Sequence, residues 1–134
     1  STWRGKALEL FPENRERIIA AENRQELWRD IEREFHTGHA RGDDQLVSRC
    51  LRYAIWTLHP SPQARTIADV SEAAAHFLYR HSHNLHQWVS RRDFLAAQKG
   101  LKLHLGLDAY AKFESRFFEK TKGYPKKKML HSGS

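Results

Sequence analysis

The sequence predicts an all-α protein of five to seven helices, packed as antiparallel hairpins or as an irregular helical bundle. Apolar residues recur at steps of three and four in one segment after another, as they do along one face of a helix. No segment alternates apolar and polar residues with the period of two that marks a half-buried strand. Residues typical of helix N-termini precede several of these segments, and short connections between neighbours favour antiparallel packing.

The N-terminal region predicts two short helices. Residues 6–11 are compatible with one short helical turn. Pro12 suits the first position of the next helix, because the amide hydrogen that proline lacks would have no helical partner there. Ile18 and Ile19 give that second helix its apolar face.

The next two helices carry the clearest patterns. Asn23 and Glu26 form a capping-box-like pair before one of them, and residues 38–42, bounded by two glycines, predict the loop that ends it. Asp43 caps the following helix, whose wide apolar stripe predicts a central position. Residues 59–62 contain two prolines and predict its end. The apolar positions of these two helices are Leu27, Trp28, Ile31 and Phe35, then Leu46, Val47, Cys50, Leu51, Ala54, Ile55 and Leu58.

The second half predicts three more helices. One spans residues 66–80, and one begins after Ser90 and ends at Gly106. The last follows Gly106, while residues 81–89 are ambiguous, with Leu85 and Trp88 as anchors. The apolar positions expected to face the core are Ile67, Val70, Ala74, Phe77 and Leu78, then Phe94, Leu95, Leu101 and Leu105, then Leu107, Tyr110, Phe113, Phe117 and Phe118. We expect Trp28, Phe35, Leu51, Ile55, Phe77, Leu101 and Phe117 to share one core.

Composition and charge favour one domain with a basic tail. The chain has 134 residues and a net charge of +7. Residues 120–134 hold five lysines and no acid, whereas residues 1–119 hold 18 Lys and Arg against 16 Asp and Glu. We therefore expect a helical domain over 1–119 and a disordered tail over 120–134. A single cysteine, with no apolar run of about 18 residues, favours a cytoplasmic protein without a membrane partner.

A histidine-rich segment is the sharpest candidate for metal chemistry. His81, His83 and His86 place three imidazoles within six residues, and imidazole nitrogens are common zinc ligands. Their spacing resembles the His-x-His-x-Asp-His motif of metallo-β-lactamase-like hydrolases, with Leu85 where that family has aspartate. That resemblance implies a two-layered β architecture with further ligands, and this sequence predicts no strands to supply them. We therefore predict no tight metal site and no cofactor.

The other candidates for catalysis are explained more simply by structure. Glu34, His36 and His39 near the end of a helix are a second possible ligand set, but histidines there are also favoured by the helix dipole. Cys50 lies on an apolar stripe, which predicts a buried, inert thiol. The sequence contains no glycine-rich phosphate loop and no convincing pair of catalytic carboxylates, so we name no catalytic residue and favour a non-enzyme.

Two features favour nucleic acid as an alternative partner. Residues 66–74 resemble the first helix of the helix-turn-helix in TetR-type repressors, which implies DNA binding. In that family a Gly-Val-Ser turn follows, whereas residues 75–80 continue the helical pattern here. Basic residues supply the second feature, because they could contact phosphates: Arg91, Arg92, Lys99 and Lys102 on one helix, with Lys126, Lys127 and Lys128 in the tail.

Several short motifs between residues 8 and 118 resemble those of a small family. They are Leu10-Phe11-Pro12, Leu27-Trp28, Tyr53-Ala54-Ile55-Trp56, His59-Pro60-Ser61 and Ser90-Arg91-Arg92-Asp93-Phe94. Together they are similar to a group of small, all-helical, uncharacterised bacterial proteins. The resemblance implies an all-helical domain of unknown function and transfers no catalytic residue.

The sequence therefore favours a non-enzymatic helical module that binds another protein, since helical hairpins offer grooves for a partner helix. Two alternatives stay open. One is a nucleic-acid-associated protein that uses the basic residues named above. The other is a metal-dependent hydrolase centred on His81, His83 and His86.

Overall fold

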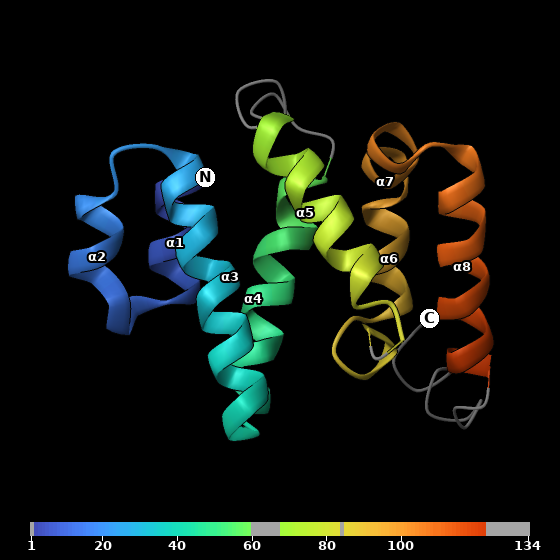
Figure 1. Ribbon diagram of the computed structural model, residues 1–134, viewed down its shortest axis with the longest axis horizontal. Helices are drawn as coiled ribbons and strands as arrows, with labels where there is room; N and C mark the ends of the chain where they lie inside the picture. The colour runs from blue at the N-terminus through green and yellow to red at the C-terminus, as the bar shows by residue number, and fades with distance from the viewer. Residues whose placement is uncertain (1, 60–67, 84, 123–134) are drawn as a thin grey trace.

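The computed structural model describes residues 2–59, 68–83 and 85–122, which form eight α-helices and no strand (Figure 1). The predicted all-α class is confirmed. The described part holds one helix more than the predicted upper limit, because the helix expected after Ser90 is divided at Ala97. The helices are α1 (Trp3–Leu10), α2 (Arg15–Ala20), α3 (Arg24–Arg41), α4 (Asp44–Thr57), α5 (Ala68–Arg80), α6 (Arg91–Ala96), α7 (Gln98–Leu105) and α8 (Leu107–Lys122), with 3-10 turns η1 (Pro12–Asn14) and η3 (Leu85–Gln87).

The helices are arranged across the molecule largely in chain order. Helices α1 and α2 lie at one end, α3, α4 and α5 occupy the middle, and α6, α7 and α8 lie at the other end (Figure 1). Helix α4 packs against α1, α3 and α5, and α5 in turn packs against α7, which packs against α8. The central position predicted for the helix after Asp43 follows from these contacts.

Helices α3 and α4 form a tight hairpin. The Asn23 side chain accepts a hydrogen bond from the Glu26 amide at 2.8 Å, so the predicted cap is present. The loop predicted over 38–42 is wrong, because α3 continues to Arg41. It ends at Gly42, whose φ of +68° is a left-handed conformation that glycine adopts at little cost. Gly38 is buried in the helix, where an added Cβ would lie 3.2 Å from Val47 Cγ2, so its small size allows α3 and α4 to approach.

The core is continuous and contains all seven residues that the apolar stripes predicted. Two groups of aromatic rings dominate it. In one, Phe35 and Phe77 lie edge to face with ring centroids 4.7 Å apart, and Trp28 contacts Phe77 at 5.4 Å. In the other, Phe94 and Phe117 stack at 4.3 Å between α6 and α8. The first group joins the α3–α4 hairpin to α5, and the second closes the C-terminal end.

Some predicted boundaries fall partly outside the described residues. Helix α4 ends at Thr57, but the predicted terminator at 59–62 is described only at His59. The predicted tail begins at Lys120, yet α8 continues to Lys122, and the rest of the tail, including Lys126, Lys127 and Lys128, lies outside the described residues.

Candidate functional site

The histidines predicted as metal ligands lie just after α5 and do not form a metal site. His83 is exposed, whereas His81 is half-buried and His86 lies in η3. Within the described residues, no group of three or more His, Cys, Asp or Glu side chains is placed to hold a metal ion. The geometry therefore gives no support to the metal-dependent hydrolase.

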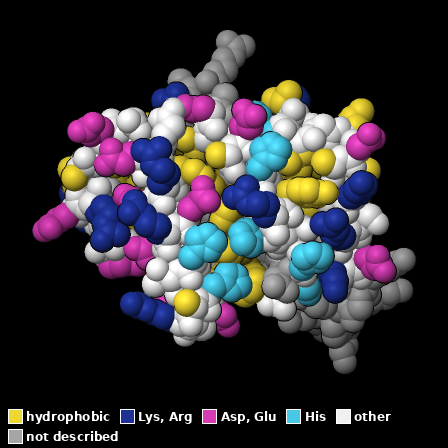
Figure 2. Space-filling view, viewed as in Figure 1, with side chains coloured by type: hydrophobic (Ala, Val, Ile, Leu, Met, Phe, Trp, Pro, Cys, Tyr) yellow, Lys and Arg dark blue, Asp and Glu magenta, His cyan; other side chains and the backbone are white. Residues whose placement is uncertain are grey.

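His81 instead meets two histidines from the other weak candidate set. Its ring centroid lies 6.1 Å from that of His36 and 6.5 Å from that of His39, the latter pair with nearly parallel rings. His36 and His39 lie in the last turns of α3, and His81 directly follows α5. These three residues are called the histidine cluster below. Histidine side chains gather near the middle of the face in Figure 2. Residues some 40 positions apart in the chain are thus brought together by the packing of α3 on α5.

Aromatic rings of the core form the floor of the histidine cluster. The ring of His81 lies 4.6 Å from that of Phe35 and 4.8 Å from that of Phe77. His39 contacts Phe35 at 4.7 Å and the half-buried Trp88 at 5.5 Å. The cluster therefore covers the edge of the aromatic group that joins α3 to α5.

Burial and like charges hold His81 in its neutral form. Desolvation lowers the pKa of His81 to about 4, and the nearby Arg80, His36 and His39 lower it further in the same direction. Arg80 pairs with Glu32 at 3.6 Å, so the carboxylate at this joint is already engaged by a cation. At neutral pH the buried side of the cluster consequently carries no charge.

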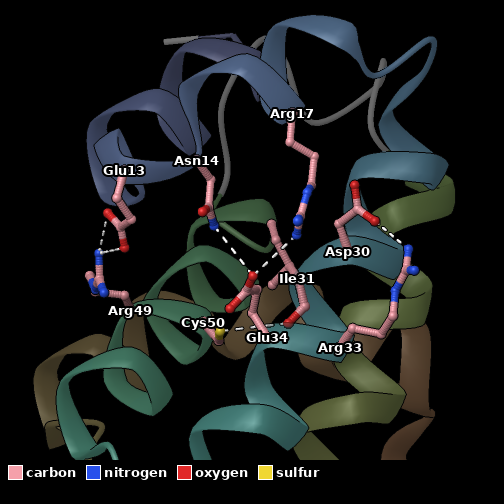
Figure 3. Close-up of polar contacts among 9 residues, drawn as sticks. All are labelled: Glu13, Asn14, Arg17, Asp30, Ile31, Arg33, Glu34, Arg49 and Cys50. Atoms are coloured by element: carbon pink, nitrogen blue, oxygen red, sulfur yellow. Dashed lines mark hydrogen bonds and ion pairs between the residues drawn. The ribbon is translucent and has the colours of Figure 1, made fainter.

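Glu34 points away from the histidines with which it was considered as a ligand. Its Oε1 accepts hydrogen bonds from Asn14 at 3.4 Å and Arg17 at 3.3 Å, which connect α3 to η1 and α2 (Figure 3). These residues border a cavity of about 10 Å³, which has room for no more than about one water molecule. The role of Glu34 is therefore to hold the N-terminal helices on α3.

Cys50 lies beneath this polar group and has no exposed surface. Its thiol donates a weak hydrogen bond to the Ile31 carbonyl at 3.6 Å (Figure 3). Burial raises its pKa to about 12, and the charge of Glu34 raises it further, whereas Arg49 opposes the shift. The buried position predicted from the apolar stripe is confirmed, and the thiol stays protonated at neutral pH.

The basic residues predicted to contact nucleic acid lie along α6 and α7, but two of them fold onto α8. The Arg91 guanidinium lies 4.8 Å from the centroid of the Phe118 ring, and Lys102 Nζ lies 5.3 Å from that of Tyr110. Arg92 and Lys99 are exposed, and neither forms an ion pair within the described residues. Only part of the predicted basic set therefore extends freely into solvent.

Exposed leucines accompany these cations, which sequence reasoning missed. Leu95 is 47% exposed, Leu103 77% and Leu107 73%, although Leu95 and Leu107 were expected to face the core. Ala97, at the break between α6 and α7, keeps right-handed helical torsion angles. Exposed positions of the two helices consequently continue along one side. That side is called the α6–α7 outer face below, and its members are Arg92, Leu95, Lys99, Leu103 and Leu107.

Comparison with protein-family models, with curated proteins and with solved structures finds no match to this chain. The resemblance to small all-helical bacterial proteins therefore stays a prediction. None of the helices in the described residues combines the length and apolar character that a membrane crossing requires.

Proposed function

We propose that this protein is a non-enzymatic interaction module that binds an acidic, amphipathic helix of another protein through the α6–α7 outer face. The exposed leucines carry the proposal. Leu103 and Leu107 are each about three-quarters exposed, and burying such side chains against an apolar partner is favourable by about 25 cal/mol per Å² of apolar surface. A partner helix with its own apolar stripe supplies that burial.

The same leucines favour a protein partner over a nucleic acid. Phosphate contacts come from cations and polar groups, and an aliphatic side chain gains little beside a phosphate backbone. On the α6–α7 outer face leucine and cation positions are interleaved, because Lys99 lies between Leu95 and Leu103. An acidic partner helix satisfies both kinds of residue at once, with its apolar stripe on the leucines and its carboxylates beside Arg92 and Lys99.

The charge of this end of the chain supports an acidic partner. Residues 85–122 contain eight Lys and Arg and four Asp and Glu. The acids do not neutralise the face: Glu114, for example, accepts a hydrogen bond from Tyr110 at 2.8 Å. A positive surface attracts an acidic partner from a distance and steers its approach, an effect that weakens as salt is added.

A synthetic amphipathic helix tests the proposal. The probe is a peptide of about 20 residues, long enough to be helical, with a leucine stripe flanked by glutamates. Fluorescence anisotropy should detect binding to the native protein. The double variant Leu103→Ser with Leu107→Ser should weaken it at least about tenfold, and the double variant Arg92→Gln with Lys99→Gln should reduce its salt dependence.

Matched controls lie elsewhere on the surface. Ile19→Ser removes an apolar side chain that is 50% exposed on α2, and Lys112→Gln removes an exposed cation of α8. Both should bind the peptide as the native protein does. Binding that survives the leucine double variant, or that is lost equally in Ile19→Ser, contradicts the proposal. Binding of duplex DNA that depends on Arg92 and Lys99 but not on the leucines would favour the nucleic-acid alternative instead.

A further inference from the structure

The histidine cluster lies where two parts of the fold meet. Helix α3 reaches it through its last turns, and α5 reaches it through its C-terminal end. The residue after α5, His81, donates its amide to the carbonyls of Phe77 and Leu78 at 3.2 Å, so its backbone is fixed to α5. Contact between the rings of His81 and Phe35 therefore links one helix end to the other.

The charges around the cluster leave little compensation for added protons. From α5, Arg80 contributes a cation, and Glu32 of α3 is already bonded to it. From α8, Arg116 donates a hydrogen bond to Ser82 Oγ at 2.9 Å, which places a second cation beside the next residue of the chain. Imidazolium rings some 6 Å apart would therefore repel one another with basic neighbours on two sides.

We propose that the histidine cluster is an acid-sensitive latch, closed at neutral pH and opened when its imidazoles take up protons. In the closed form His81 lies against Phe35 and Phe77, sheltered from water. A protonated ring is better solvated away from those rings and away from His36 and His39. Acid therefore favours a form in which the end of α3 separates from the turn that follows α5.

The described part of that turn carries the consequence of opening. Leu85 and Val89 are buried, and Trp88 contacts His39 across the joint. The turn leads directly into α6 at Arg91, so opening would loosen the start of α6. The latch depends on contacts between α3 and α5 and does not rest on the proposed function.

Amide hydrogen exchange, corrected for the intrinsic effect of pH and measured at about pH 7 and about pH 5, tests the latch on the full chain. Protection in the last turns of α3 and in residues 85–89 should fall at least about tenfold more than protection in α8. His81→Phe keeps an aromatic ring and removes the titrating group, so it should abolish this local loss. The exposed double variant His36→Gln with His39→Gln should reduce it.

His83→Gln is the matched control, because His83 is an exposed histidine two residues from His81 and outside the cluster. It should open as the native protein does. A native protein whose protection falls equally in every helix undergoes ordinary acid unfolding, which overturns the latch. Unchanged protection at the joint overturns it too, as does a double variant that opens like His83→Gln.

Discussion

The two ends of the molecule treat their cations differently. Residues 1–59 contain ten Lys and Arg and ten Asp and Glu, and cations there are paired, as in Arg49 with Glu13 and Arg17 with Glu34 (Figure 3). Within the described residues every ion pair joins residues that precede His81. Beyond it, cations lie on aromatic rings, as Arg91 does on Phe118, or extend into solvent.

This contrast indicates different roles for the two ends. An ion pair inside the fold uses up the charge that a partner would need, whereas a cation on a ring face keeps donors available at its edge. The N-terminal end therefore spends its charge on holding α1 and α2 to α3 and α4. The C-terminal end is held by its aromatic core, which leaves its charge free for recognition.

Removal of either aromatic group should cost the most stability. Phe94 contacts Phe113, Phe117 and Phe118, so Phe94→Ala leaves a large cavity at the C-terminal end and should cost about 3–5 kcal/mol. Leu51→Ala in the central helix α4 should cost about 2–5 kcal/mol. Denaturant titration, followed by both circular dichroism and tryptophan fluorescence, measures each loss. A loss below about 0.5 kcal/mol for Phe94→Ala would show that the C-terminal end is not held by its aromatic core.

Gly100→Ala tests the contact that joins the C-terminal end to the centre. A Cβ at Gly100 would lie 2.7 Å from the Leu58 carbonyl oxygen, a backbone atom, so α7 must move away from the end of α4. Alanine favours a helix over glycine by about 1 kcal/mol, but overpacking of this kind costs about 1–3 kcal/mol. We expect net destabilisation by thermal melting. Gly5→Ala is the control, because its nearest atom is the Thr2 hydroxyl oxygen at 3.1 Å. A higher melting temperature for Gly100→Ala would mean that the two ends are loosely joined.

Sequence patterns predicted the helices and the core, because helical periodicity and caps are local. Ser90 accepts a hydrogen bond from the Asp93 amide at 3.0 Å, as its capping pattern predicted. Gly100 was expected to be only a mild weakness in its helix, since no local pattern shows that Leu58 will lie against it. An apolar stripe likewise does not say which of its members a neighbouring helix will cover. Leu95 and Leu107 belong to such stripes and are left exposed.

The candidate sites were less predictable than the fold. Three histidines from two separate segments meet only because α3 packs on α5, and no spacing within either segment reports that contact. The signal available in the sequence was the position of His39 near the end of one helix and of His81 at the end of another. Such ends meet in an antiparallel arrangement of some helices and not of others, so the tertiary structure was needed to bring them together.

Acid should destabilise the protein through His81. Its pKa is lowered to about 4 in the folded state, against about 6.5 for an unperturbed imidazole. Between these values the unfolded chain binds more protons at this residue than the folded chain, so stability falls as pH decreases from about 6.5 to about 4. The urea midpoint should therefore decrease less in His81→Phe than in the native protein over this window. Equal decreases would show that other groups govern acid stability.

The smallest expected effects compare one cation from each end. Arg49 Nη1 donates to both Glu13 carboxylate oxygens, at 2.9 and 2.6 Å, and to the Leu10 carbonyl at 3.0 Å. Arg49→Gln should therefore cost about 1 kcal/mol, since it breaks a partly exposed ion pair and a contact to the end of α1. Arg92→Gln removes no ion pair among the described residues and should change stability by less than about 0.5 kcal/mol. Paired urea titrations at low and high salt measure both. A salt-sensitive loss confined to Arg49→Gln is expected, because screening weakens an existing pair and has little to weaken at Arg92. An equal loss in the two variants would place Arg92 among the cations that hold the fold, and would remove it from those that the C-terminal end keeps for a partner.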